Sequence, residues 1–337
     1  TLIDCIRKVW EKIILHRINH QWHIHHTLSP LQHCQKGRGT DSALLQRAAT
    51  AEAAEEASFN LYTSSWDFRK AFDSVSKPII KLAWSRLGVP TEVVEWIAAL
   101  DQDPHLIHLT PHTETHWHPN NNTPLQTQYN NHIDPPMYLT AVRGVGQGAS
   151  LSPATWAALM DILLRSLEII APNTNPLIPG LPGTLTPSQD TCYADDLLSA
   201  TATIPHLQTK ADLVSAFALI FGLDIATNKL RLHAHLWDPT ANIPNPLPTL
   251  ILRGPQWTPI PIPIEHSTSR QTLHLKYLGP TIDLNNSSNT LLQELSTYIN
   301  KTTNRIISRR ASTQTKLTVL QSAVFGRLRY FMPHLTN

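Results

Sequence analysis

Apolar residues recur every three or four positions in several stretches of the chain, which is the spacing of one face of an α-helix. Near the N-terminus, isoleucine, valine and tryptophan alternate with basic residues, so residues 1–26 are predicted to form one amphipathic helix. Gly88 and Gly222 each follow an apolar-periodic segment, where a helix commonly ends in a left-handed residue. The further helices predicted in this way are one ending at residue 57, then 76–88, 91–100, 154–170 with Ser152 as its cap, 205–221, and two near the C-terminus.

Short β-leaning runs alternate with these helices, at residues 59–68, 191–198 and 223–230. The order strand, helix, helix, paired strands, helix, strand predicts an α+β protein with helices on one face of an antiparallel sheet. Residues 101–139 are rich in His, Asn, Thr and Pro and are interpreted as an insertion. Residues 237–270 form a second, proline-rich insertion that is predicted to lack regular structure.

Two adjacent carboxylates, Asp195 and Asp196, stand between apolar residues where a strand is expected. Burying a charge is costly unless cations or strong donors surround it. Neighbouring side chains on a strand point to opposite faces, so the two carboxylates meet at one site only at a tight turn, and a β-hairpin tip is predicted. An exposed turn with two solvated Asp is the alternative for such a pair seen alone. Asp67 ends the 59–68 run, and beside the pair it would complete an oxygen-rich site suited to hard divalent cations that bind phosphates.

Five short motifs follow one another along the chain: D-x-x-K-A-F-D, R-G-x-x-Q-G with a following L-S-P, Y-A-D-D, a glycine-led segment ending in Lys, and K-Y-L-G. They lie at Asp67–Asp73, Arg143–Pro153, Tyr193–Asp196, Gly222–Lys229 and Lys276–Gly279. In this order they resemble the reverse transcriptase family, and specifically its non-LTR (LINE-like) retrotransposon branch. The resemblance runs from about Gln35 to Gly279. Ala149 and Ser150 stand where the family usually has Asp-Pro or Cys-Pro, a departure that removes no catalytic group.

The resemblance implies a right-hand polymerase fold. Residues 1–58 would form helical fingers, 59–236 the palm with its 101–139 insertion, and 271–337 the primer-grip strand and the start of a helical thumb, after the insertion at 237–270. The implied activity is RNA-directed DNA polymerisation, in which a DNA primer is extended with dNTPs along an RNA template. Nucleotidyl transfer of this kind uses two divalent cations, Mg²⁺ or alternatively Mn²⁺.

The resemblance also implies residue roles. Asp67 and Asp195 would bridge the metals, with Asp196 as a weaker or outer ligand. Lys229 matches the position proposed as general acid for the departing pyrophosphate, or as its electrostatic partner. Phe72 matches the steric gate, whose ring would occupy the space of a ribose 2′-hydroxyl, and ordinary core packing is the alternative.

Other positions would border the nucleic acid. Gln147 and Gly148 match the motif beside the nascent base pair, with Arg143 at the start of the same motif as a nucleotide-binding residue. Tyr277 and Gly279 would belong to the primer grip.

Basic residues supply candidate phosphate contacts. Lys36 and Arg38 lie in a glycine-punctuated loop before a helix, where free backbone N–H groups add to their charge, although a capping loop with solvated charges is an equal alternative. The chain carries a net charge of only +2, yet seven Lys or Arg and no Asp or Glu occur from residue 301 onward. This end is predicted to hold an RNA–DNA duplex, with a solvated helix face as the alternative. Its candidate residues are Lys301, Arg305, Arg309 and Arg310.

Three widely spaced cysteines and no C-x-x-C pair favour a reducing compartment. No apolar run reaches the length of a membrane span, and the N-terminus has no signal-peptide layout, so an intracellular protein of the nucleus or cytoplasm is expected, without membrane contact. Two rival interpretations stay open. One is a group II intron-type or other cellular reverse transcriptase with the same site, and the other is a degenerate or domesticated, non-catalytic nucleic-acid-binding protein.

Overall fold

The computed structural model describes most of the chain. The described residues are 5–100, 105–107, 116–117, 124–125, 137–139, 143–146, 149–179, 185–187, 190–237, 247–268, 274–276, 281–283, 289–325 and 327–328.

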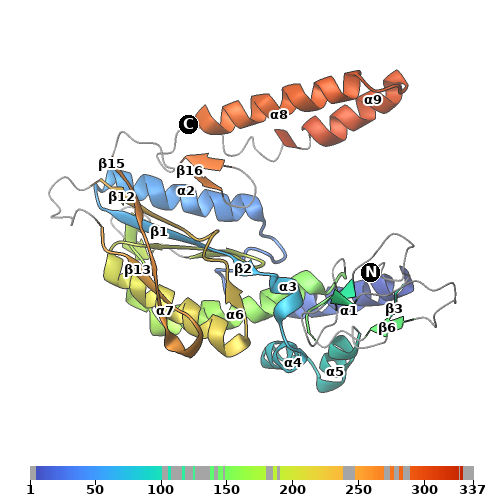
Figure 1. Ribbon diagram of the computed structural model, residues 1–337, viewed down its shortest axis with the longest axis horizontal. Coiled ribbons are helices and arrows are strands. Elements are labelled where there is room, and N and C mark those ends of the chain that lie inside the picture. The colour runs from blue at the N-terminus through green and yellow to red at the C-terminus, as the bar shows by residue number, and fades with distance from the viewer. Residues whose placement is uncertain are drawn as a thin grey trace.

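The centre of the molecule is a five-stranded sheet with the strand order β15-β12-β1-β10-β9 (Figure 1). Its strands are β1 (Leu61–Trp66), β9 (Thr191–Tyr193), β10 (Asp196–Thr201), β12 (Arg231–Leu236) and β15 (Glu265–Thr268). β1 pairs antiparallel with β10 and β12, and β10 pairs antiparallel with β9, whereas β15 joins β12 in parallel. The α+β prediction is confirmed, with one parallel edge strand that the sequence pattern did not indicate.

Helices lie on both faces of this sheet. α6 (Ser152–Ile170) and α7 (Ile204–Phe221) share the main core with residues such as Tyr62 and Leu197. α2 (Thr40–Glu56) covers part of the other face, where Ala51 packs with Leu61. The expectation of helices on one face alone is corrected in this respect. Five of the six residues of β1 are buried, which agrees with a sheet covered on both faces. In a strand with one solvated face, buried and exposed residues would alternate.

Further helices lie at the end of the molecule that carries the N-terminus (Figure 1). They are α1 (Cys5–Ile24), α3 (Ala71–Ser74), α4 (Lys77–Arg86) and α5 (Thr91–Ala99). α4 ends before Gly88 (φ 76°) and α7 before Gly222 (φ 65°), so both predicted helix ends are confirmed. Ser152 does not cap α6, because Leu151 occupies the cap position and Ser152 is the first helical residue. The Ser152 hydroxyl instead donates to the Gly146 carbonyl at 2.8 Å.

The prediction for residues 237–270 is wrong, because this segment contains β13 (Leu250–Arg253), β14 (Pro259–Ile262) and β15. β13 packs on α7 through the buried residue Leu252. The N–H groups of Ile251 and Arg253 point away from β14, toward α7 side chains. The residues opposite them, Pro261 and Pro259, therefore need no N–H for this ladder.

Other strands are short and paired. β2 (Phe68–Arg69) pairs with β11 (Asp224–Ile225), and the 101–139 insertion contributes two strand pairs. The remaining strands are β3 (His105–Ile107), β4 (His116–Trp117), β5 (Pro124–Leu125), β6 (Met137–Leu139), β7 (Leu177–Pro179), β8 (Leu185–Pro187), β16 (His274–Lys276) and β17 (Thr281–Asp283).

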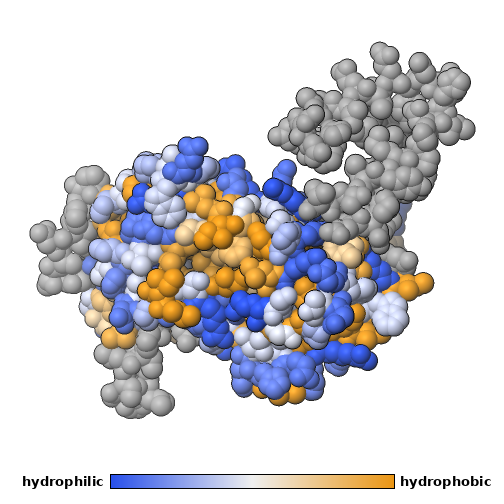
Figure 2. All heavy atoms as spheres, turned by 90° about the horizontal axis from the view of Figure 1, so that it is seen from below, coloured by the Kyte–Doolittle hydropathy of each residue, from blue (hydrophilic) through white to orange (hydrophobic). Residues whose placement is uncertain are grey.

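The C-terminal part consists of α8 (Asn289–Ile307) and α9 (Thr313–Leu320), followed by a π-helical turn at Gln321–Phe325. Figure 1 shows α8 and α9 as a layer beyond α2, on the side of the sheet opposite to α6 and α7. The face of the molecule formed by α6 and α7 carries an apolar area (Figure 2). Exposed apolar residues of these two helices include Ile169, Ile170 and Ile220. Among the described residues, no helix combines the length and the apolar character needed to cross a membrane.

Candidate active site

Strand register brings the three predicted carboxylates to one end of the sheet. β1 ends at Trp66, which pairs with Leu197 of β10. Asp67 directly follows Trp66 and Asp196 directly precedes Leu197, and the two carboxylates are close enough for the charge of Asp67 to raise the pKa of Asp196. The sheet itself therefore brings together two carboxylates that are more than a hundred residues apart in the chain.

Asp195 lies in the turn between β9 and β10. Tyr193 pairs with Asp196, so Ala194 and Asp195 form a two-residue turn. Ala194 has a φ of 55°, as tight hairpins require at the first turn position. The predicted hairpin tip is confirmed, and the turn places Asp195 and Asp196 beside Asp67.

The electrostatics of this end of the sheet show that the three carboxylates share one environment. Burial raises the pKa of Asp195, and the charge of Asp67 raises it further. Burial together with the charges of Asp195 and Asp67 raises the pKa of Asp196 to about 6. The positive charge of Lys229 partly offsets both shifts. The site thus holds more negative charge than its own cation balances.

Lys229 is held beside these carboxylates by the backbone. β11 pairs with β2, and the N–H of Ala226 donates to the carbonyl of Asp67 at 2.8 Å. The Lys229 Nζ then donates to Asp67 Oδ2 at 2.8 Å. This hydrogen bond, together with the charge of Asp67, raises the pKa of the Lys229 ammonium.

Asp67, Asp195 and Asp196 fit a hard divalent cation by their chemistry, since carboxylate oxygens are its preferred ligands and the site has an uncompensated negative charge. In the part of the chain that the structure describes, no three His, Cys, Asp or Glu side chains converge into a ready-made coordination shell. The ammonium of Lys229 supplies a positive charge at Asp67 Oδ2.

Phe72 lies on α3 and is half-buried, with its ring 5.5 Å from the ring of Trp156. The loop that begins at Arg143 packs against the backbone of α3. The N–H of Gly144 donates to the carbonyl of Val75 at 2.7 Å, and the N–H of Val145 donates to that of Phe72 at 2.8 Å. The exposed Arg143 thereby lies in a loop attached to the segment that carries Phe72.

The other predicted residues are not brought to the carboxylates by any described contact. Lys36 and Arg38 are exposed, and the Arg38 guanidinium donates to the carbonyl of Pro30. Four basic residues are exposed on α8 or in the turn after it, within the layer beyond α2 (Figure 1): Lys301, Arg305, Arg309 and Arg310. Four predicted positions lie outside the described residues: Gln147, Gly148, Tyr277 and Gly279.

Two buried charges carried no prediction. Glu11 of α1 is fully buried, and its carboxylate accepts hydrogen bonds from the Ser150 N–H at 2.6 Å and from Arg7 Nε at 2.7 Å. Lys210 of α7 forms a buried ion pair with Asp190, just before β9, at 2.6 Å. The i,i+4 spacing of Arg7 and Glu11 was a local signal, whereas nothing near Lys210 in the sequence indicated its partner.

A carboxylate at a strand end and two more at the adjoining hairpin tip, on an α+β sheet backed by two helices, define a polymerase-type palm. The chain belongs to the reverse transcriptase (RNA-dependent DNA polymerase) family, whose family model matches residues 1–282. No curated protein matches the chain.

Solved structures similar to the chain include telomerases of two Candida species. Apo telomerase from Candida tropicalis is 11% identical, with 96% of this chain and 50% of that chain covered and a TM-score of 0.48. The form of that protein truncated from its C-terminal domain is 13% identical, with 68% and 40% covered and a TM-score of 0.43. Telomerase from Candida albicans, in complex with a TWJ fragment of telomeric RNA, is 11% identical, with 97% and 47% covered and a TM-score of 0.42. The chain thus spans half or less of the length of these proteins.

Proposed function

We propose that this chain is the polymerase domain of an RNA-directed DNA polymerase of the non-LTR retrotransposon type, which extends a DNA primer along an RNA template. The observation that carries the proposal is the meeting of Asp67, Asp195 and Asp196 at one end of the palm sheet. Family membership supports the type of reaction, and the five ordered motifs support the branch.

The three carboxylates would hold two Mg²⁺ ions, for which Mn²⁺ can substitute. When bound, such ions would supply the positive charge that favours deprotonation of the primer 3′-hydroxyl and that stabilises the triphosphate and the leaving pyrophosphate. Asp67 and Asp195 are proposed as the shared ligands and Asp196 as the outer one. The raised pKa of Asp196 means that it must lose its proton before it can bind a cation well.

Lys229 is better suited to an electrostatic role than to proton donation. Its raised pKa keeps the ammonium charged and makes it a weaker acid. Its side chain is 62% exposed, so it can turn from Asp67 toward a bound phosphate. We therefore propose that Lys229 neutralises Asp67 in the resting site and the pyrophosphate during the reaction.

Phe72 is proposed to exclude a 2′-hydroxyl, because its half-buried ring lies on the segment that follows Asp67. The ring of Trp156 packs against it in a tilted arrangement, with the ring centres 5.5 Å apart. The exposed basic residues of α8 and of the loop around Lys36 are proposed to contact the phosphates of the template and primer.

Primer extension on an RNA template tests the proposal directly. Asp195→Asn keeps the shape of the side chain but removes a charged ligand, so extension should fall at least about a hundredfold with no loss of folding. Asp224→Asn is the matched control, because Asp224 is 72% exposed on β11 and lies outside the carboxylate group. Full activity of Asp195→Asn would refute the assignment of the carboxylates.

The same assay separates the rival interpretations. A wild-type protein that binds the primer–template but does not extend it would support a domesticated nucleic-acid-binding protein. A group II intron-type enzyme shares the site and would also extend the primer. It would be distinguished by template preference, measured with intron RNA against RNA of a non-LTR element.

A further inference from the structure

The edge of the catalytic hairpin is not open to solvent. β9 is the last strand of the sheet and has only three residues, so its pairing with β10 alone would be weak. The Ser29–Cys34 segment, between α1 and α2, meets the outer edge of β9 through a parallel bridge between Gln32 and Cys192. The N–H of His33 donates to the Cys192 carbonyl at 2.7 Å, and the N–H of Cys192 donates to the Leu31 carbonyl at 2.9 Å.

Gln32 adds a side-chain contact at the same place. Its amide is fully buried, donates to the Sγ of Cys192 at 3.6 Å, and accepts from the N–H of Cys34 at 2.9 Å. Cys192 is itself fully buried and lies three residues before Asp195. A shift of this segment therefore moves the strand that carries the turn.

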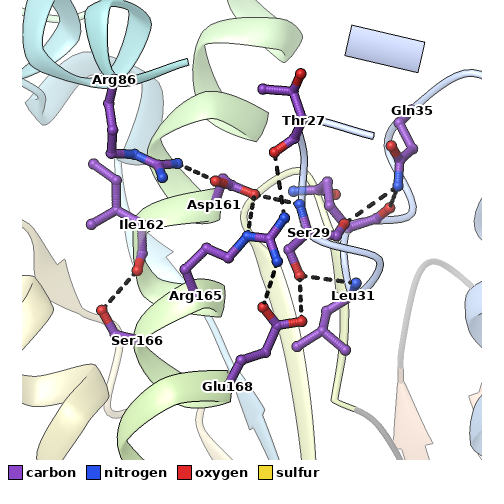
Figure 3. A network of polar contacts seen from close by, with 11 residues as sticks. Thr27, Ser29, Leu31, Gln35, Arg86, Asp161, Ile162, Arg165, Ser166 and Glu168 are labelled. Atoms are coloured by element: carbon purple, nitrogen blue, oxygen red, sulfur yellow. Dashed lines mark hydrogen bonds and ion pairs between the residues drawn. The ribbon is translucent and has the colours of Figure 1, made fainter. Parts of the chain in front are cut away.

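Carboxylates of α6 hold the start of the segment (Figure 3). Asp161 is fully buried, accepts from the Ser29 N–H, and is paired with Arg86 of α4. The Ser29 hydroxyl donates to Glu168 Oε1 and accepts from the N–H of Leu31, both at 3.1 Å. Because α6 is the most deeply buried helix of the core, these bonds tie the segment to a rigid support.

The other end of the segment is tied to α2. The Nδ1 of His33 lies 2.7 Å from Ser42 Oγ, and its Nε2 lies 3.1 Å from Gln46 Oε1. The segment is thus fixed at both ends and bonded to β9 in its middle. Asp195 and Asp196 repel each other at the tip that this strand carries, so the hairpin needs an external support to keep a single geometry.

We propose that the Ser29–Cys34 segment is a positioning element for the catalytic turn, with Ser29 and Gln32 as its positioning residues. This inference rests on the proposed function, in which the turn binds divalent cations. A variant with a loosened segment keeps all three carboxylates, but Asp195 and Asp196 should occupy a wider range of positions. Cation binding should therefore weaken more than nucleic-acid binding.

The test uses Ser29→Ala and Gln32→Met, which remove hydrogen bonds without changing charge and with little change in volume. Ser166→Ala is the matched control, because the Ser166 hydroxyl on α6 donates to a carbonyl of its own helix, that of Ile162. The alkylation rate of Cys192 measures how often the outer edge of β9 becomes exposed. Peptide mass spectrometry separates the alkylation of Cys192 from that of the other cysteines. The exposed Cys5 serves as the internal standard.

Each test variant should alkylate at Cys192 about fivefold faster than the wild type, the factor that corresponds to the loss of one ordinary hydrogen bond. Mn²⁺ binding, measured by electron paramagnetic resonance without substrates, should weaken by a similar factor. In primer extension, kcat should fall while the KM for primer–template stays within twofold, and Ser166→Ala should match the wild type.

Two results would overturn the proposal. Unchanged Cys192 alkylation would show that the segment does not hold β9. Faster alkylation with unaltered Mn²⁺ affinity would show that it holds the strand without positioning the carboxylates. A wild-type protein that binds Mn²⁺ but extends no primer would count against the proposed function, while the alkylation and Mn²⁺ measurements would still decide the role of the segment.

Discussion

Replacing Asp196 by Asn should stabilise the protein in the absence of divalent cations. Burial and the charges of Asp195 and Asp67 raise the pKa of Asp196 to about 6, against 3.8 for a free side chain. At neutral pH the folded protein therefore carries an ionised group that its surroundings disfavour. Asn has nearly the same shape and no charge, so the variant avoids that cost.

The size of the effect follows from the shift. A rise of the pKa from 3.8 to about 6 corresponds to about 3 kcal/mol, since each unit is worth 1.36 kcal/mol. The side chain is partly exposed and solvent screens its charge, so about 1–2 kcal/mol is expected. Below pH 3.8 Asp196 is protonated in both states and the variant has no advantage. The advantage grows as the pH rises toward 6 and is complete above it, because the wild type progressively loses stability in that window.

Urea unfolding in EDTA at pH 4 and pH 7.5 measures this difference. Asp224→Asn is the control, and its free energy of unfolding should stay within about 0.5 kcal/mol of the wild type, because its ion pair with Arg69 is exposed on both sides. Excess Mg²⁺ should stabilise the wild type and remove the advantage of Asp196→Asn, because it binds the folded state. An Asp196→Asn protein that is less stable than the wild type at pH 7.5 in EDTA would refute the electrostatic reasoning.

Three further perturbations have defined outcomes. Burial lowers the pKa of His235 to about 3, so the folded protein loses stability as the pH drops below 6.5 and the unfolded chain takes up a proton. In urea unfolding, His235→Phe should regain about 2 kcal/mol of the free energy of unfolding at pH 5, with little change at pH 7.5. Phe72→Val should raise the ratio of ribonucleotide to deoxynucleotide incorporation, whereas an unchanged ratio would indicate plain packing. Replacing Arg305, Arg309 and Arg310 together by Ala should flatten the salt dependence of primer–template binding by about two to three in the log–log slope, and an unaltered slope would indicate a solvated face.

Local chemistry was sufficient to predict the elements whose causes are local. Gly222 follows an apolar-periodic segment and adopts φ 65°, as a helix end requires. Asp195 and Asp196 between apolar residues predicted a hairpin tip, because two neighbours on a strand share a site only at a turn. The contact of Asp67 with Lys229 was not predicted from spacing and came from the pairing of β2 with β11.

Long-range packing decided the elements that the sequence did not predict. Prolines argued against strands in 237–270, yet Leu250 and Leu252 bury against α7 and the prolines fall where the ladder needs no N–H. Lys210 would be expected on a solvated helix face, but it is buried against Asp190, Asn175 Oδ1 and a backbone carbonyl. Such a pair is specified only once α7 and the start of β9 are packed together, so no local pattern contains it.

Gly144 shows how a single backbone position can control the segment that carries Phe72. Its φ of 81° is left-handed, and a Cβ there would lie 2.7 Å from the Phe72 carbonyl oxygen and 2.9 Å from the Cα of Asp73. Gly144→Ala therefore combines a strained φ with a steric clash against backbone atoms, which cannot change rotamer as a side chain can. Gly88 is the matched control, since its φ is 76° and a Cβ there would meet nothing within 4 Å.

Gly88→Ala should cost about 1 kcal/mol in the free energy of unfolding, from the strained φ alone. Gly144→Ala should cost more, by roughly 1–3 kcal/mol, because α3 and the loop must move apart. It should also change the ratio of ribonucleotide to deoxynucleotide incorporation, because the Phe72 ring moves with α3, whereas Gly88→Ala should leave that ratio as in the wild type. Equal losses of stability in the two variants would show that the loop yields without displacing Phe72, and the ratio would then stay unchanged in both.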